Sequence, residues 1–163
     1  MRKIYALVLL SLFVFSCNED DTATVTTDKL SLIYNNEEIQ FEKILVINVE
    51  NTNHEIIGKS IIGYVYYKNE PSVTKYKLEL HFYNNNNIYQ LFGVTFQFPD
   101  ISSDDPVSGS EYYNYFDQPE DFPFVSNIVF SEGKLTGTFS GELMTVDGGI
   151  SISGGKIDVA IPE

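Results

Sequence analysis

Residues 76–98 read YKLELHFYNNNNIYQLFGVTFQF and contain the clearest structural pattern of the chain. Apolar and polar side chains alternate over residues 76–82, and a period of two is typical of a β-strand with one buried face. The four asparagines 84–87 follow, and asparagine tolerates the left-handed backbone of a tight hairpin turn. Alternation resumes over residues 88–98, where both faces are partly apolar. The stretch therefore predicts an antiparallel hairpin whose second strand lies inside a sheet.

The same alternation extends on both sides of this hairpin, from Lys29 upstream to Ile161 downstream. It shifts phase near Lys43, which predicts a bulge. No segment after residue 28 shows a helical period of 3.6 residues. The expected turns are Asn35-Asn36, Asn51–Asn53, Asn69–Ser72, Glu132–Lys134, Asp147–Gly149 and Gly154-Gly155. Roughly eight to ten strands at this spacing predict an all-β fold, an antiparallel β-sandwich or alternatively a β-barrel.

Composition narrows the class of protein. The chain has 163 residues with 12 Phe, 11 Tyr and no Trp, and its length after the first 28 residues suits one domain over residues 29–163. A formal charge of -13 argues against nucleic acid as a partner, because polyanions gain nothing from counterion release. The single cysteine, Cys17, rules out an internal disulfide.

The first 17 residues, MRKIYALVLLSLFVFSC, have the composition of a secretory signal, with two cations before an apolar run. The run from Ile4 to Ser16 would span roughly 20 Å as a helix, less than a hydrocarbon core of roughly 30 Å. Its ending resembles a bacterial lipobox, which implies acylation of Cys17, for example with palmitate. A plain cleaved signal would instead leave Cys17 as an unpaired thiol in an oxidising compartment. We expect a signal peptide at 1–16 and an acylated cysteine with a polar tether at 17–28.

An acidic run follows the cysteine: Asn18, Glu19, Asp20 and Asp21. It resembles the export signal of Bacteroidota-type surface lipoproteins, and this resemblance implies an outer-membrane protein that faces the cell exterior. The alternatives are a solvated tether and a position on the periplasmic face. In either case the lipid anchor makes the membrane a partner of the chain.

The C-terminal region carries a second resemblance. Residues 134–143, KLTGTFSGEL, and residues 150–159, ISISGGKIDV, are similar to the G-x-F-x-G-x-L endings of small Bacteroidota-type lipoproteins. The resemblance implies an all-β C-terminal region and no particular activity. The simpler interpretation is two hairpins whose glycines mark bulges or tight strand crossings.

No catalytic motif is present. His54 and His81 lack ligand or acid–base spacing, and we expect both to be solvated surface residues. The chain has no G-x-S-x-G elbow, no phosphate-binding glycine loop and no EF-hand spacing. We therefore expect no catalytic residue, no metal and no cofactor, with a hydrolase kept as the exception.

One long segment interrupts the strand pattern. Residues 100–124 read DISSDDPVSGSEYYNYFDQPEDFPF, an expected loop rich in acids and rings. On extended backbone Tyr113 and Tyr115 share one face and Tyr112 lies opposite. We predict that Tyr113, Tyr115 and Phe116 form an extracellular binding site for a glycan or small ligand, with an envelope protein as another possible partner, and that Tyr112 anchors the core. In the alternative interpretation the rings cap the core, and the protein is a structural or accessory component of an outer-membrane assembly.

Overall fold

The computed structural model describes residues 28–99, 109–115, 124–145 and 148–162, and these ranges contain strands and turns. The strands, in chain order, are β1 (Lys29–Tyr34), β2 (Glu37–Gln40), β3 (Lys43–Glu50), β4 (Ile56–Tyr67), β5 (Glu70–Asn85), β6 (Ile88–Pro99), β7 (Gly109–Tyr115), β8 (Phe124–Ser131), β9 (Lys134–Thr145) and β10 (Gly148–Ala160). The prediction of an all-β fold is confirmed.

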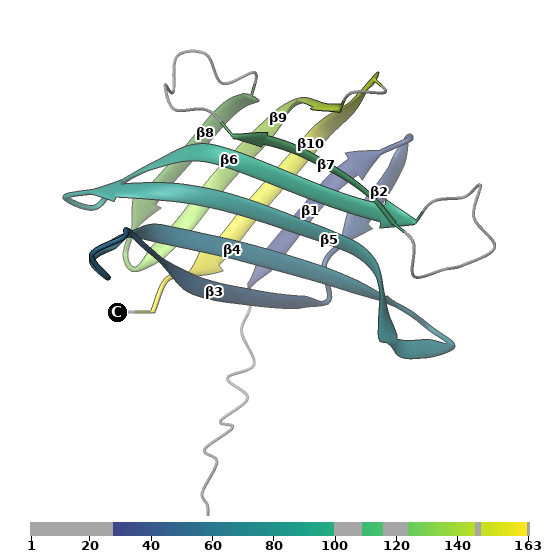
Figure 1. Cartoon of the computed structure of the whole chain (residues 1–163), viewed down its shortest axis with the longest axis horizontal. Helices are drawn as coiled ribbons and strands as arrows, with labels where there is room; N and C mark the ends of the chain where they lie inside the picture. The colour runs from purple at the N-terminus through teal and green to yellow at the C-terminus, as the bar shows by residue number, and fades with distance from the viewer. Residues whose placement is uncertain (1–27, 100–108, 116–123, 146–147, 163) are drawn as a thin grey trace, which may run out of the picture.

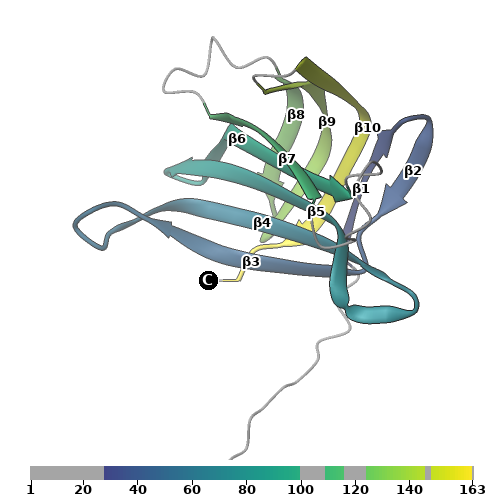
Figure 2. The ribbon, with the colours of Figure 1, turned by 45° about the vertical axis from the view of Figure 1, so that its right-hand side comes forward.

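The strands form two antiparallel sheets of five strands each. Sheet A has the order β2-β1-β10-β9-β8, and sheet B has the order β3-β4-β5-β6-β7. Figures 1 and 2 show the strands of sheet B lying across those of sheet A, so the fold is the predicted β-sandwich. β6 lies between β5 and β7, as the apolar character of both its faces predicts.

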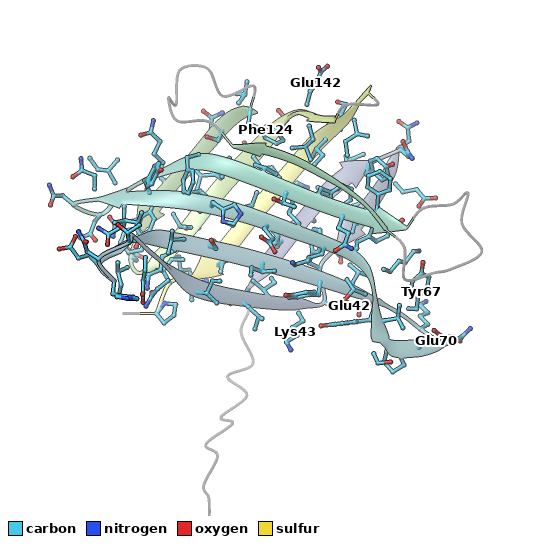
Figure 3. The ribbon with its side chains drawn as sticks, viewed as in Figure 1. Glu42, Lys43, Tyr67, Glu70, Phe124 and Glu142 are labelled. Carbon is cyan, nitrogen blue, oxygen red and sulfur yellow. The ribbon has the colours of Figure 1, made fainter. Side chains whose placement is uncertain are left out.

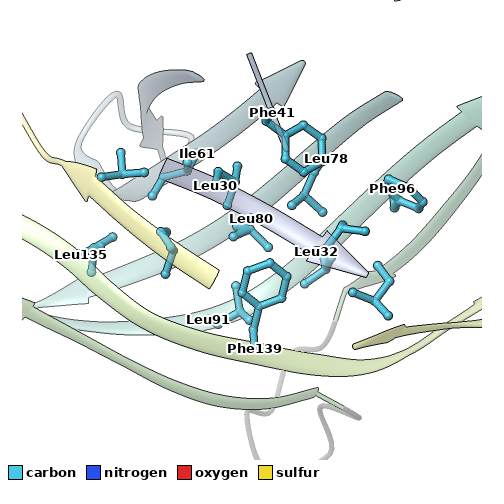
Figure 4. Close-up of a cluster of buried hydrophobic side chains, with 14 of the residues drawn as sticks. Leu30, Leu32, Phe41, Ile61, Leu78, Leu80, Leu91, Phe96, Leu135 and Phe139 are labelled. Atoms are coloured by element: carbon cyan, nitrogen blue, oxygen red, sulfur yellow. The ribbon is translucent and has the colours of Figure 1, made fainter. Parts of the chain in front are cut away.

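The core fills the space between the two sheets (Figure 4). Leu80 and Phe96 of sheet B are completely buried there, as are Leu32 and Leu135 of sheet A. Core residues recur at every second position of a strand, because the Cβ atoms of a strand alternate between the two faces of its sheet. The alternation in residues 76–82 therefore marks the inner face of β5 correctly.

The chain passes from sheet A to sheet B between β2 and β3. The Phe41 N–H donates to the Leu30 carbonyl at 3.0 Å, and the Glu42 N–H donates to the Tyr64 carbonyl at 2.9 Å, so adjacent residues bond to different sheets. The bulge predicted near Lys43 is wrong, because the phase shift marks this crossing. The ring of Phe41 lies against Gly63, where a Cβ would come within 2.7 Å of its Cγ.

Most turns occur where asparagine or glycine predicted them. Asn35 and Asn36 have φ values of 51° and 63°, and Asn86 and Asn87 have values of 51° and 66°, as two-residue hairpin turns require. The turn expected at residues 69–72 lies one residue earlier, at 68–69, and β5 already begins at Glu70.

The turn expected at Gly154-Gly155 does not exist. Both glycines lie inside β10, where the pairing with β9 shifts register between Ile152 and Gly155. Gly154 has a φ of 56°, and a Cβ at Gly155 would lie 2.5 Å from Cε2 of Phe139. These glycines therefore form a bulge, in agreement with the simpler interpretation of the C-terminal pattern. Asp147 lies outside the described residues.

The segment 100–124 is not a continuous loop. Residues 109–115 form β7, which pairs with β6 and makes the edge of sheet B. The loop prediction failed there because glycine, serine and acidic residues outweigh the short tyrosine alternation.

Cys17 and the acidic run 18–21 lie outside the described residues. Within the described ranges, no helix has the length and hydropathy needed to cross a membrane.

Candidate functional site

The outer face of sheet B, turned away from the core, carries a polar strip along β5. The strip consists of Lys77, Glu79 and His81, which alternate with the buried Leu78 and Leu80. Their side chains are only 29 %, 18 % and 14 % exposed, respectively. Charged residues on an open sheet face are normally well solvated. This degree of burial distinguishes the strip from an ordinary surface.

Hydrogen bonds and ion pairs connect the strip. The Oγ atom of Ser60 on β4 lies 2.6 Å from Nδ1 of His81, and Nε2 of His81 lies 3.4 Å from a carboxylate oxygen of Glu79. The ammonium of Lys77 pairs with the other oxygen of the same carboxylate. Both ring nitrogens of His81 and both oxygens of Glu79 are therefore engaged.

The electrostatics follow from these contacts. The pKa of Glu79 is lowered to about 2, mainly because His81 hydrogen-bonds to the carboxylate. Burial of the carboxyl group opposes the shift, and Lys77 adds to it through a hydrogen bond and its charge. Glu79 therefore stays ionised across the whole physiological pH range, and its charge is balanced locally by Lys77.

The centre of this face excludes water. Ser60 and Thr95 are each 3 % exposed, and Ile62 is 8 % exposed, although all three lie on the outer face. The pairing of β4, β5 and β6 aligns Ile62 with Glu79 and Glu79 with Thr95. The buried Ile62 and Thr95 thus flank the Glu79 carboxylate on the two neighbouring strands.

Stacked aromatic rings lie at the two ends of the strip. Tyr64 pairs with Lys77 in the register of β4 and β5, and the rings of Tyr64 and Tyr66 are 6.0 Å apart with an interplanar angle of 8°. Beyond His81, the rings of Tyr83 and Phe92 are 3.9 Å apart at 17°. Phe92 is the extra residue where the pairing of β5 and β6 shifts register, and this bulge turns its ring toward His81 at 5.9 Å. We call these the two ring pairs.

The register places part of the predicted binding site beside this strip. Tyr113 pairs with Thr95 and Tyr115 pairs with Gly93, whereas Tyr112 pairs with the core residue Phe96. Positions 113 and 115 thus extend the rows that contain Glu79 and His81. Of these tyrosines only the backbone is described, and Phe116 lies outside the described residues.

The two histidines differ from each other. His54 lies in the turn after β3 with a φ of 62° and a 90 % exposed side chain, which confirms the predicted surface position. The same prediction for His81 is wrong, because Ser60 and Glu79 hold its half-buried ring. The polar alternation along β5 was visible in the sequence. The partner on β4 was not, because it depends on the strand register.

The geometry is suited to holding a polar ligand. The Ser60 hydroxyl is too buried to meet a substrate, and its hydrogen bond to His81 fixes the ring in place. Lys77 and Glu79 retain partial exposure between ring faces that could contact a ligand. In the part of the chain that the structure describes, no group of three or more His, Cys, Asp or Glu side chains is placed to hold a metal ion.

Comparisons with known proteins assign the chain to no family. No protein-family model matches the chain, and no curated protein or solved structure is significantly similar to it.

Proposed function

We propose that the chain is a lipid-anchored protein of the bacterial outer membrane whose β-sandwich binds a neutral glycan on the outer face of sheet B. The observation that carries this proposal is the half-buried polar strip between two ring pairs. The proposal replaces a site made only of Tyr113, Tyr115 and Phe116 with one that includes the rows in which positions 113 and 115 lie.

The chemistry of the strip favours a neutral polyhydroxylated ligand. Aromatic faces can pack against the apolar face of a sugar ring, while the Lys77 ammonium and the Glu79 carboxylate offer a donor and an acceptor to hydroxyl groups. The two charges compensate each other, so the strip itself selects neither anions nor cations. The net charge of -13 disfavours acidic glycans.

The anchor would be the lipid on Cys17. Residues 17–28 then form a tether of at most about 40 Å when extended, which holds the domain away from the bilayer. β1 begins directly after it at Lys29. We propose display on the cell exterior, with the periplasmic face as the alternative.

The test is binding of the full-length chain, purified in detergent, to an array of neutral and acidic glycans. Tyr64→Ala and Glu79→Gln should each weaken binding of a neutral glycan about tenfold, since aromatic anchors and charged hydrogen bonds dominate such contacts. Tyr67→Ala is the matched control, because Tyr67 lies on the same strand outside the two ring pairs. Unchanged binding by both site variants, with melting temperatures close to that of the wild type, would disprove the assignment.

One observation favours the alternative of an accessory component in an outer-membrane assembly. β8 is an edge strand of sheet A, and it exposes Val125 and Val129 by 68 % and 61 %. Unprotected edge strands with apolar side chains pair readily with other chains. If Val129→Lys removes an envelope partner from a cross-linked complex while glycan binding is absent, this alternative replaces the glycan proposal.

A further inference from the structure

A concave site separate from the polar strip lies between the two sheets, at the end of the sandwich where β1 and β4 finish. It is a cleft of about 360 Å³. Its lining residues are Tyr34, Asn35, Glu37, Tyr67, Lys75, Tyr76 and Phe98. Figure 3 labels Tyr67 at this end of sheet B. The cleft shares no residue with the polar strip or the ring pairs, and its volume is in the range of small-molecule pockets.

The aromatic walls of the cleft are held by the core. The Tyr34 ring lies 5.0 Å from the Phe98 ring, and 5.3 Å from the ring of the fully buried Phe96. The Tyr76 ring also stacks with Phe96, with centroids 6.0 Å apart and an interplanar angle of 8°. Because Phe96 fixes both tyrosines, the cleft presents preorganised ring faces.

A cation already lies at the Tyr76 ring. The ammonium of Lys75 is 5.0 Å from the centroid of the Tyr76 ring, within the range of a cation–π contact. Lys75 is half-buried on β5, directly before Tyr76. An ammonium group is strongly hydrated, and its flexible stem lets it leave the ring at modest cost.

Oxygen atoms lie at the same place. Burial raises the pKa of the Tyr76 hydroxyl, and the charges of Glu37, Tyr34 and Tyr67 raise it further. All three residues line the same cleft as Tyr76. Glu37 is exposed on β2, and among the described residues no cation lies within 4.0 Å of its carboxylate. The cleft thus combines phenol rings with a carboxylate that can accept a cation.

We propose that this cleft binds a small organic ammonium ion, and that the Lys75 ammonium occupies the position of that ion in the unliganded protein. Ring faces attract the positive charge of an alkylammonium group, and Glu37, which lines the same cleft, supplies a carboxylate to neutralise that charge. The charge of -13 on the chain raises the local concentration of cations and speeds their encounter with the cleft.

The first experiment separates charge from shape. Choline and its uncharged isostere 3,3-dimethylbutan-1-ol are titrated into the full-length protein by calorimetry at constant ionic strength. We expect choline to bind at least about tenfold more tightly than the alcohol, in line with a desolvated cation–π contact. Equal binding of both compounds, or no binding of choline, would overturn the proposal.

The second experiment uses two substitutions with opposite expected effects. Glu37→Gln should weaken choline binding severalfold, because the carboxylate is lost. Lys75→Ala should tighten it severalfold, because the competing ammonium is removed. The matched controls are Glu38→Gln, on the same strand as Glu37, and Lys156→Ala, an exposed lysine on β10 that does not line the cleft; both should leave the affinity unchanged.

Equal effects in the controls would mean that only the net charge matters, and weaker binding by Lys75→Ala would show that its ammonium does not compete; either result would overturn the site. The glycan site is tested separately, since Tyr64→Ala should leave choline binding intact.

Discussion

The Oγ atom of Ser60 and the Nδ1 atom of His81 lie 2.6 Å apart across β4 and β5, although the residues are 21 positions apart in the chain. Ser60 is almost completely buried, so its hydroxyl has no water to replace this contact. The pair fixes the imidazole ring on the outer face of sheet B and directs its other nitrogen toward Glu79.

This geometry predicts the tautomer of His81. In its neutral form the ring should carry its proton on Nε2, where it donates to Glu79, while Nδ1 accepts from Ser60. Long-range ¹H–¹⁵N correlation spectra can distinguish the two nitrogens. Ser60→Ala should cost about 1–2 kcal/mol of unfolding free energy, because it leaves Nδ1 without its partner. The exposed Ser126 provides the control, since Ser126→Ala should cost almost nothing. A proton on Nδ1 would contradict the proposed roles.

Glu79 should make the domain sensitive to acid. Its folded pKa of about 2 lies below the usual value of 4.5, so its stabilising contribution is complete above about pH 5. The contribution is lost as the pH falls from about 5 to about 2, and it amounts to about 3 kcal/mol. Denaturant unfolding across this range should show a shallower loss of stability for Glu79→Gln than for the wild type. Glu38→Gln, an exposed change of the same kind, should leave the slope unchanged; identical slopes for all three proteins would refute the prediction.

Any side chain at Gly63, next to the segment that crosses between the sheets, should lower the stability of the domain. A Cβ there would lie 2.7 Å from Cγ of Phe41 and 2.8 Å from Cδ2 of Leu30. Gly63→Ala should therefore cost about 1–3 kcal/mol, the usual range for an overpacked core. Phe41→Leu should recover part of this loss in the double variant, because it removes the ring that the new methyl group meets. The double-mutant cycle would contradict the steric account if the two losses were simply additive.

The first hairpin turn should accept glycine better than alanine. Asn36 has a φ of 63°, a conformation that a Cβ-bearing residue without a local polar group adopts reluctantly. Asn36→Ala should destabilise the domain by about 1 kcal/mol, whereas Asn36→Gly should leave the melting temperature unchanged or raise it slightly. If both variants had the same stability, the left-handed backbone would not be the constraint.

Cys17 should be the acylation site. Cys17→Ser should abolish incorporation of labelled palmitate and release the protein from the membrane fraction. The control replaces Glu19, Asp20 and Asp21 by alanine; it should keep the label and become resistant to protease added to whole cells. A Cys17→Ser variant that is still labelled and membrane-bound would refute lipidation of Cys17. A wild-type protein that already resists the protease would show that the acidic run 18–21 is only a tether and not an export signal.

Local patterns in the sequence determined much of the fold. Side-chain direction in a strand depends on backbone geometry alone, so the alternation of residues 76–82 predicted the inner face of β5 correctly. Asparagine pairs predicted two hairpin turns for an equally local reason, the low cost of a positive φ. The single cysteine and the apolar N-terminus led to a proposed anchor without any tertiary information.

Tertiary structure decided what depends on register and on the packing of the sheets. A phase shift at Lys43 looks the same in sequence whether the strand bulges or the chain changes sheets, and only the hydrogen bonds of Phe41 and Glu42 distinguish them. Ser60 meets His81 because two strands pair in one register, and a shift by one residue would separate them. The cleft at Tyr76 joins residues of both sheets. No local pattern encodes that contact, because it arises from how the two sheets pack.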